Sequence, residues 1–579
     1  LNWYWVGGPE AGGTYAISGS SPLTAVAGAN GSSFFTQGSG NNLNTAGQYA
    51  NGSLTGTGTF MNFGQGEPNG TGGGENAGQL FGTLGLWNYL SRTTAYTTNN
   101  GTYDVRGYVR ETNATPSVVN INAGAGSVSI GGAVGASKDV GQLNVTASAF
   151  TAGAIKTSSG LSVTNSGASS ITGAIMGTGS LTKAGAGTLT LSGTSDYTGS
   201  TTLNAGTLKI SSTGKIYQTD ITTNLYVNSG AVLDVHTWTW EGSLGKFRFD
   251  PPNLVINGGT IRYSGATGGE WRSFTVGNLG ATFESPTAGV TWNLNNSANI
   301  PVISGDLTFT GAGDFVLNHN LTGSGYSLIK NGSGKLTLGG NNTYSGATQV
   351  NGGTLSVASS TGLGSTVAGT TVASGGALEF SGGITVSEAI SVTGTGVSSA
   401  GALRNLSGDN AVTGLVTLTG DAEVQSDAGS LTFKPSAGNA FTGNYSLTFD
   451  GAGTTMSSAL GIGTGSVIKL GTGTFNLLTA NTYTGNTTLS GGTLGIYDNA
   501  SISTGTLTAA ASTKVMFGRN VTNFANNMTL TGSVTFDLDS SVDYLVVGGG
   551  GGGGGARAER GRGGLGQQRR LRAGPVDRR

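Results

Sequence analysis

A threefold internal repeat constrains the fold of this 579-residue chain more than any other feature of its sequence. Each copy opens with a lysine followed by two alternating glycines, reaches a Tyr-x-Gly step at the same distance from that lysine, and closes on Gly-Thr-Leu. The lysine and tyrosine pairs are Lys183 and Tyr197, Lys330 and Tyr344, and Lys469 and Tyr483. Such repetition is typical of solenoids, in which a small unit buries its apolar face only by stacking on the next unit.

Each copy is predicted to form short strands joined by tight corners. In the first copy leucines alternate with threonines at 188–191, which places Leu189 and Leu191 on one face of a strand. Glycine accounts for 108 of the 579 residues, and it permits the positive φ that sharp corners require.

The spacing of related strands predicts the size of one coil. The terminal strand of the first copy recurs from Leu208 to Leu233, and that of the second copy recurs at a similar interval, from Leu355 to Leu378. A period of about 24 residues that contains several short strands is typical of a parallel β-helix.

Composition excludes the main alternatives. Charged residues make up only 9% of the chain, and blocks of helix-favouring residues are absent, so neither a helical bundle nor an α/β enzyme is expected. Only ten prolines accompany the glycines, without a Gly-X-Y period, which excludes collagen. There is no cysteine, and no apolar run of about 18 residues that would form a transmembrane helix.

The complete pattern of each copy resembles the autotransporter-associated β-strand repeat of bacterial passenger domains. This resemblance implies a long right-handed parallel β-helix, exported to the extracellular side or the cell surface, with the signal peptide and anchor outside this sequence. We assign the β-helix to 114–540, with repeats near 179–210, 325–357 and 464–496. The glycine-rich and arginine-rich tail, 541–579, is expected to lack a fixed fold.

The segment 1–113 carries a different set of motifs. They are Glu67-Pro68-Asn69, then Leu86-Trp87-Asn88, and a closing strand from Gly107 to Glu111. In this order the motifs resemble the carbohydrate-recognition half of a C-type lectin-like domain, over 1–113. The resemblance implies an α+β fold whose two helices precede Leu1, so that the domain is truncated here.

The same resemblance implies a calcium-dependent sugar site. Its carbohydrate-binding residues are Glu67, Pro68, Asn69, Glu75 and Asn88, and its calcium ligands are Glu67, Asn69, Glu75 and Asn88. Tyr89 stands where the family has a carboxylate after Trp-Asn, so we expect a weakened site with a dissociation constant of about 10⁻⁴–10⁻³ M. The alternative is that Pro68 and Trp87 only hold a lectin-like core that no longer binds calcium.

An aromatic cluster in the β-helix is a second candidate. His236, Trp238 and Trp240 alternate with threonines, so that they would project from one face of a strand. Together with Trp271 they would form an aromatic platform that stacks on sugar rings. The alternative, which the sequence favours, is that these rings are packed inside the coil.

Residues for catalysis are sparse. The two histidines, His236 and His319, are far apart in the sequence, and no paired carboxylates of a glycosidase type occur. A β-helical polysaccharide-degrading enzyme would need acids grouped around Trp238 and Trp240, so we expect no enzyme. Nucleic-acid binding would depend on the basic tail alone and is not expected.

These features lead to one function hypothesis with an alternative. The hypothesis is an extracellular adhesin, in which a carbohydrate-recognising head stands on a β-helical stalk, with surface or extracellular glycans, and host or matrix proteins, as partners and calcium as cofactor. The alternative is a purely structural surface or matrix stalk whose lectin-like head does not bind sugars.

Overall fold

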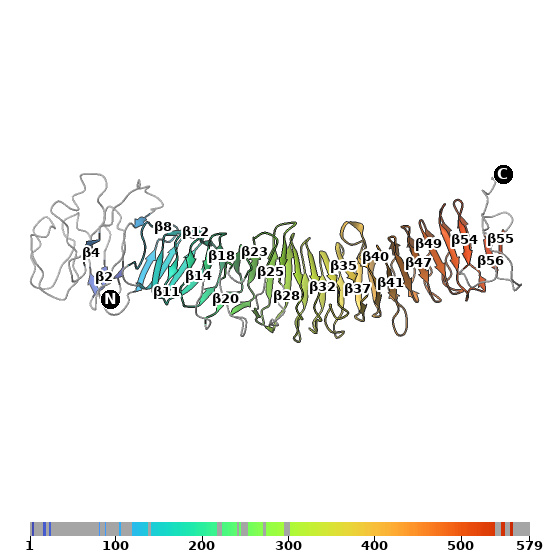
Figure 1. Cartoon of the computed structure of the whole chain (residues 1–579), viewed down its shortest axis with the longest axis horizontal. Coiled ribbons are helices and arrows are strands. Elements are labelled where there is room, and N and C mark those ends of the chain that lie inside the picture. The colour runs from blue at the N-terminus through green and yellow to red at the C-terminus, as the bar shows by residue number, and fades with distance from the viewer. Residues whose placement is uncertain are drawn as a thin grey trace, which may run out of the picture. The chain divides into compact units, whose positions relative to one another are not determined.

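The computed structural model describes residues 118–538, apart from gaps at 137–139, 217–222, 240–241, 245–252, 270–273 and 295–301. The chain divides into two compact units, Leu1–Ala281 and Thr282–Arg579. The described residues are almost entirely strands, corners and loops, with a single 3₁₀ turn among them, Val397–Ser399 (Figure 1). No helix in this described part is long and apolar enough to cross a membrane.

The first unit is a parallel solenoid with two long ladders. One ladder contains β7 (Val118–Asn122), β9 (Val140–Ala147), β11 (Ile155–Asn165), β14 (Ser180–Ala184), β17 (Thr201–Leu203), β20 (Leu225–Asn228), β22 (Leu254–Asn257) and β24 (Thr275–Val276). The other contains β8 (Ser127–Ile130), β10 (Ala149–Ala152), β12 (Ala168–Ile171), β15 (Thr188–Leu191), β18 (Gly206–Ile210), β21 (Ala231–Val235) and β23 (Thr260–Tyr263).

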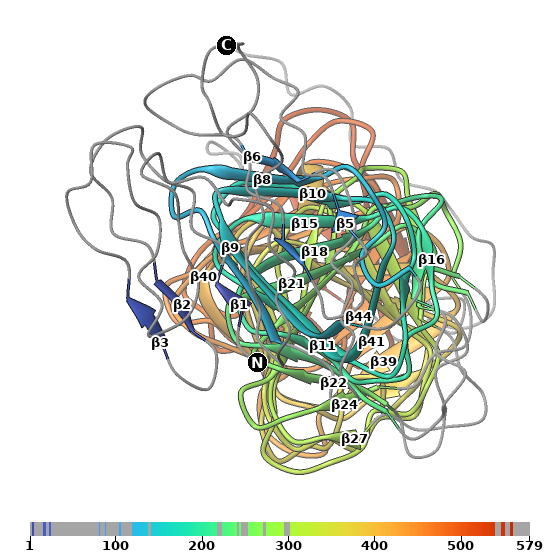
Figure 2. The same cartoon turned by 90° about the vertical axis from the view of Figure 1, so that its left-hand side faces the viewer.

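The two ladders form different sides of the same coil. In Figure 2, β8, β10, β15 and β18 lie along one side and β9 and β11 along another. Shorter strands complete the turns: β13 (Ile175–Met176) pairs with β11, and β16 (Thr194–Ser195) pairs with β19 (Lys215–Ile216). Short backbone strands are also assigned before residue 118, at β1 (Trp3–Tyr4), β2 (Ala16–Ser18), β3 (Pro22–Thr24), β4 (Leu80–Phe81), β5 (Trp87–Asn88) and β6 (Tyr103–Val105).

The second unit is also a parallel solenoid, with three ladders. The first holds β28 (Leu307–Gly311), β30 (Leu328–Lys330), β32 (Thr348–Val350), β34 (Thr370–Val372), β37 (Ile390–Gly394), β40 (Val416–Ser426), β42 (Phe441–Thr442) and β45 (Leu460–Gly461). The second holds β26 (Thr291–Asn293), β29 (Asp314–Leu317), β31 (Lys335–Leu338), β33 (Gly353–Val357), β35 (Gly376–Ser381), β38 (Leu403–Ser407), the end of β40, β43 (Leu447–Asp450), β46 (Val467–Lys469), β48 (Thr487–Leu489), β50 (Leu507–Ala509) and β53 (Met528–Leu530).

The third ladder of this unit begins only part-way along it. It holds β36 (Thr385–Val386), β39 (Asp409–Val412), β41 (Ser430–Phe433), β44 (Thr454–Ser457), β47 (Thr474–Leu477), β49 (Thr493–Ile496), β51 (Lys514–Phe517) and β54 (Thr535–Leu538). The remaining strands are β25 (Ala281–Ser285), β27 (Val302–Ile303), β52 (Asn523–Phe524), β55 (Val546–Gly549) and β56 (Ala556–Glu559).

Alternation along the strands builds the core. In β15 the side chains of Leu189 and Leu191 are fully buried, whereas the two threonines between and before them are half-buried, as the sequence predicts. The register then stacks Leu189 on Leu208 and Leu208 on Leu233, so that one apolar column continues from turn to turn. Each buried leucine of this kind contributes roughly 1.5–3 kcal/mol relative to an exposed one.

The turns are less uniform than the sequence predicts. In the second repeat the register advances by a short step, from Leu336 to Leu355, because the corners there are tight. The next turns take longer steps, from Leu355 to Leu378 and then from Leu378 to Leu403. The expected parallel β-solenoid is therefore confirmed, and the length of a turn varies around the predicted period, because loops of different length leave the inward columns in place.

The glycine of each Gly-Thr-Leu step is required by its corner. Gly206, Gly353 and Gly492 have φ of 66°, 64° and 64°. A Cβ atom on Gly206 would lie 2.3 Å from the carbonyl oxygen of Gly185 on the preceding turn. Both the backbone conformation and the close approach of two turns therefore exclude a side chain.

A comparison of two glycines tests this requirement. Gly230 has a φ of 78°, but a Cβ atom there would meet nothing within 4 Å. We expect Gly230→Ala to cost about 1–2 kcal/mol for the backbone conformation alone, and Gly206→Ala to cost a further 1–3 kcal/mol or so because the turns must separate. Urea unfolding followed by circular dichroism measures the difference, and equal midpoints for the two variants would contradict the close-approach explanation.

Candidate functional site

The predicted calcium and sugar residues are not tested by the structure. Glu67, Pro68, Asn69 and Glu75 lie outside the described residues, and of Asn88 only the backbone, in β5, is described. The lectin-like assignment of 1–113 and the tail at 541–579 likewise stay predictions.

The prediction of an aromatic platform is wrong for Trp238, the one platform tryptophan among the described residues. β21 ends at Val235, so the strand alternation does not continue through His236 and Trp238. His236 is half-buried, whereas the side chain of Trp238 is 1% exposed and offers no face to a sugar ring. Trp240 and Trp271 lie outside the described residues. The alternative, that the ring is packed inside the coil, is confirmed for Trp238. Burial of a large indole ring stabilises the fold more than its exposure to water would.

The described part of the chain holds both histidines of the sequence. His236 belongs to the first unit and the buried His319 to the second. Within the described residues, no group of three or more His, Cys, Asp or Glu side chains is arranged to hold a metal ion.

The repeats themselves hold the most distinctive polar groups. The side chains of Lys183, Lys330 and Lys469 are at most 2% exposed, although lysine is almost never fully buried without partners. The Nζ atom of Lys330 donates to the carbonyl oxygens of Asn331, Gly332 and Gly352, at 2.7, 3.0 and 3.1 Å. Three donors thus meet three acceptors, two on the lysine's own corner and one on the next turn.

The first copy repeats this arrangement in full, and the third copy repeats the two bonds within the lysine's own corner. Lys183 donates to Ala184 and Gly185 at 2.7 and 2.8 Å, and to Ala205 of the next turn at 3.2 Å. Lys469 donates to the carbonyl oxygens of Leu470 and Gly471. Burial lowers the pKa of all three lysines to about 8, and for Lys330 and Lys469 a nearby aspartate acts in the opposite direction.

A tyrosine and a threonine form the second buried contact of each copy. Tyr344 is fully buried, and its hydroxyl lies 2.5 Å from Oγ1 of Thr348 in the same corner. The same contact joins Tyr483 to Thr487 at 2.6 Å, and Tyr197 to Thr201. Burial raises the pKa of these tyrosines above its usual range, so the phenols stay neutral. The sequence singled out both the lysine and the tyrosine as repeat markers, and the structure shows that they close the interior of the coil.

These buried contacts coincide with a known repeat. Residues 181–210, 328–357 and 467–496 match the family model described as the passenger-associated-transport-repeat. The chain contains three passenger-associated-transport repeats. Each match runs from the strand that carries the buried lysine to the strand that contains the threonine and leucine of the Gly-Thr-Leu step.

A curated relative extends this similarity. The chain is 32% identical over 288 residues to a protein named "Adhesin BmaC autotransporter" from Brucella suis biovar 1 (strain 1330). The match covers 49% of this chain but only 7% of the relative, so the chain spans a small part of the length of the protein that it resembles.

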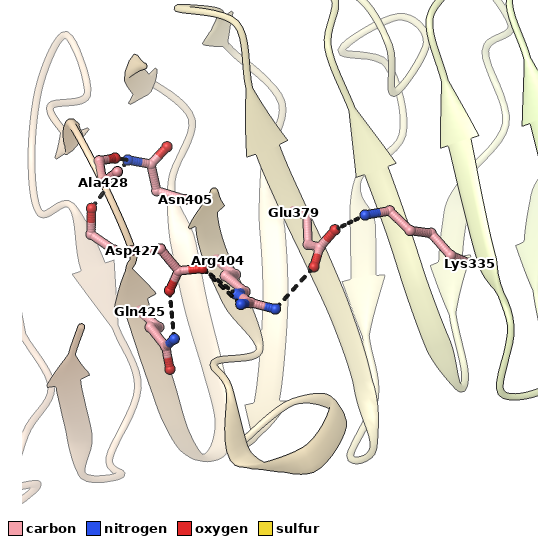
Figure 3. Close-up of polar contacts among 8 residues, drawn as sticks. Lys335, Glu379, Arg404, Asn405, Gln425, Asp427 and Ala428 are labelled. Atoms are coloured by element: carbon pink, nitrogen blue, oxygen red, sulfur yellow. Dashed lines mark hydrogen bonds and ion pairs between the residues drawn. The ribbon is translucent and has the colours of Figure 1, made fainter. Parts of the chain in front are cut away.

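From the second repeat onward an ion-pair ladder crosses several turns (Figure 3). Nζ of Lys335 lies 2.5 Å from Oε2 of Glu379, and Nη1 of Arg404 lies 3.3 Å from Oε1 of the same carboxylate. The Arg404 guanidinium also holds Oδ2 of Asp427 through Nε at 2.9 Å and Nη2 at 2.7 Å. Gln425 donates to the other oxygen of Asp427 at 2.6 Å. The Glu379 side chain is only 6% exposed, so this ladder is partly withdrawn from water.

The first unit has charged residues at the corresponding positions. Asp234 on β21 and Arg262 on β23 are register partners, as are Glu379 on β35 and Arg404 on β38. In both cases the acid lies one turn, and the arginine two turns, beyond the Gly-Thr-Leu strand of a repeat. Sequence reasoning missed this feature, although Asp234, Arg262 and Glu379 stand in the recurring strand segments that revealed the coil.

Removal of one buried lysine tests its role. We expect Lys330→Met to lower the free energy of unfolding by about 2 kcal/mol, because three carbonyl groups lose their donor. The control is Lys434→Met at an exposed position, where a change within about 0.5 kcal/mol is expected. Urea midpoints of the two variants give the comparison, and a stable Lys330→Met protein would show that the ammonium group is dispensable.

The ion-pair ladder generates a second stability prediction. Arg404→Met should cost about 2 kcal/mol, because it leaves the buried Glu379 with a single cationic partner. The control pair is Lys514 and Asp537, 2.7 Å apart with side chains 37% and 50% exposed, where Lys514→Met should cost at most about 0.5 kcal/mol. Differential scanning calorimetry of both variants measures the loss of thermal stability. An equal loss in the two variants would contradict the prediction.

Proposed function

We propose that this chain is part of a bacterial passenger protein that is displayed on the cell surface and acts as an adhesin. The observation that carries the proposal is the threefold passenger-associated-transport repeat, built each time around the same buried lysine and the same Tyr–Thr contact. Surface display follows from the passenger character of the repeat.

An adhesive role is supported by the relative and by the chemistry of the solenoids. The similar Brucella protein is named an adhesin. In the described residues polar side chains hold neighbouring turns together, as Lys330 does within a repeat and Arg404 does outside it. Such a scaffold suits the presentation of a binding region at a distance from the cell, because stacked turns add length without needing a larger core.

The binding region of this proposal is the lectin-like segment at 1–113. Glu67, Asn69, Glu75 and Asn88 would hold calcium and, with Pro68, a sugar that completes its coordination shell. The second candidate is a stalk that attaches to host or matrix proteins without calcium, and it is favoured by the loss of a carboxylate at Tyr89.

Bead retention by the whole chain tests both versions. Fluorescent beads coated with residues 1–579 are passed over immobilised glycans and over matrix proteins, in calcium and in EDTA. We expect retention on at least one glycan in calcium, with a loss of about tenfold or more for Glu67→Gln, because a calcium ligand is removed. Glu10→Gln, another carboxylate of the same segment, is the matched control and should retain full binding.

The other outcomes separate the alternatives. In one of them, beads are retained on matrix proteins alone, equally well in EDTA and with Glu67→Gln. That result would contradict the glycan-binding head and support the stalk that attaches to proteins. Absence of retention on every surface would contradict the adhesive function itself.

A further inference from the structure

The second repeat is followed by a buried carboxylic acid. Glu388 lies between β36 and β37, and its side chain is 3% exposed. Its Oε1 accepts a hydrogen bond from Oγ1 of Thr370 at 2.9 Å, whereas Oε2 has no hydrogen-bond partner. A carboxylate in such a place would be an ion in the core with half of its acceptors unsatisfied.

This acid extends the polar contacts of the repeat across further turns. Thr370 is the register partner of Thr348, whose Oγ1 lies 2.5 Å from the Tyr344 hydroxyl and donates to the Leu363 carbonyl oxygen at 3.2 Å. The buried tyrosine, the two threonines and the carboxyl group therefore form one polar column inside the second unit.

The first and third repeats lack the column, which makes them natural controls. There the register partner of the repeat threonine is a leucine, Leu225 beside Thr201 and Leu507 beside Thr487. Both leucines are fully buried. An apolar side chain thus occupies the place where Thr370 holds the acid, so the first and third repeats have no buried acid hydrogen-bonded at this position.

The environment of Glu388 favours its neutral form. Burial raises its pKa to about 8, and the hydrogen bond from Thr370 acts in the opposite direction. The Tyr344 phenol interacts electrostatically with Glu388, and the Tyr326 ring stacks on that of Tyr344, with ring centroids 5.6 Å apart. Burial raises the pKa of both phenols above its usual range, so that Glu388 is the member of this cluster that ionises near neutrality.

We propose that Glu388 makes the turns from β32 to β37 a pH-operated weak point, closed while its carboxyl group is protonated and opening when it is ionised. The sign follows from proton linkage. Between pH 4.5 and about 8 the closed turns hold a proton that the opened turns release, so opening becomes more favourable as the pH rises. The equilibrium constant for opening should rise by up to tenfold per pH unit in this window, and level off above it.

Hydrogen exchange on the full chain, from pH 5 to 7.5, tests the proposal, because the buried lysines of all three repeats stay protonated in this range. After correction for intrinsic exchange, amides of β32, β34 and β37 should lose protection as the pH rises, and those of β17, β20, β48 and β50 in the other repeats should not. Glu388→Gln should abolish the pH dependence. Burial also raises the pKa of Glu423 on β40, to about 7. This second acid is unchanged in Glu388→Gln, and any pH dependence that it causes would be measured at the amides of its partner strand β43.

A second variant keeps the test independent of how well Glu388→Gln folds. Thr370→Val removes the donor to Oε1 at nearly constant volume, so the pH midpoint of opening should move upward. Thr371→Val, on the exposed face of the same strand, is the matched control and should leave the midpoint unchanged. The proposal is overturned if protection does not change with pH, if Glu388→Gln keeps the slope, or if both threonine variants behave alike.

Discussion

The buried ammonium groups of the repeats are the interaction on which each of these coils depends. A tight corner turns several backbone carbonyl groups inward, where no strand can supply their donors. Lys330 supplies them with one flexible side chain, because its three N–H bonds reach its own corner and the corner of the next turn. The contact therefore satisfies the corner and fixes the register between turns at the same time.

Glycine complements the lysine at this corner. The lysine needs neighbouring turns close enough for one ammonium to bond to both, and Gly206 allows that approach because no Cβ atom separates the backbones. The Tyr–Thr contact then closes another part of the interior without leaving a free hydroxyl. The three repeat residues thus form one cooperating unit, which explains why they recur together at fixed spacing while the connecting turns vary in length.

Polar groups beyond the repeats are held by the same stacking. Glu379 reaches its register partner Arg404 on the next turn and Lys335 two turns before it because the turns are stacked in register. Glu388 is the inward counterpart, a polar group that the stack encloses together with a single donor. The first column stabilises neighbouring turns through charge, whereas the second makes their stability depend on protonation.

The sequence by itself determined the parallel solenoid, the strands that carry the buried leucines, and the corners that need glycine. These follow from local alternation and from the spacing of the repeats, which are properties of short segments. The tertiary structure alone decided the burial of Trp238, the pairing of Glu379 with Arg404 and the enclosure of Glu388. The physical reason is that loops of unequal length set which residues become neighbours across turns, and the environment of a side chain comes from those neighbours and not from its own strand.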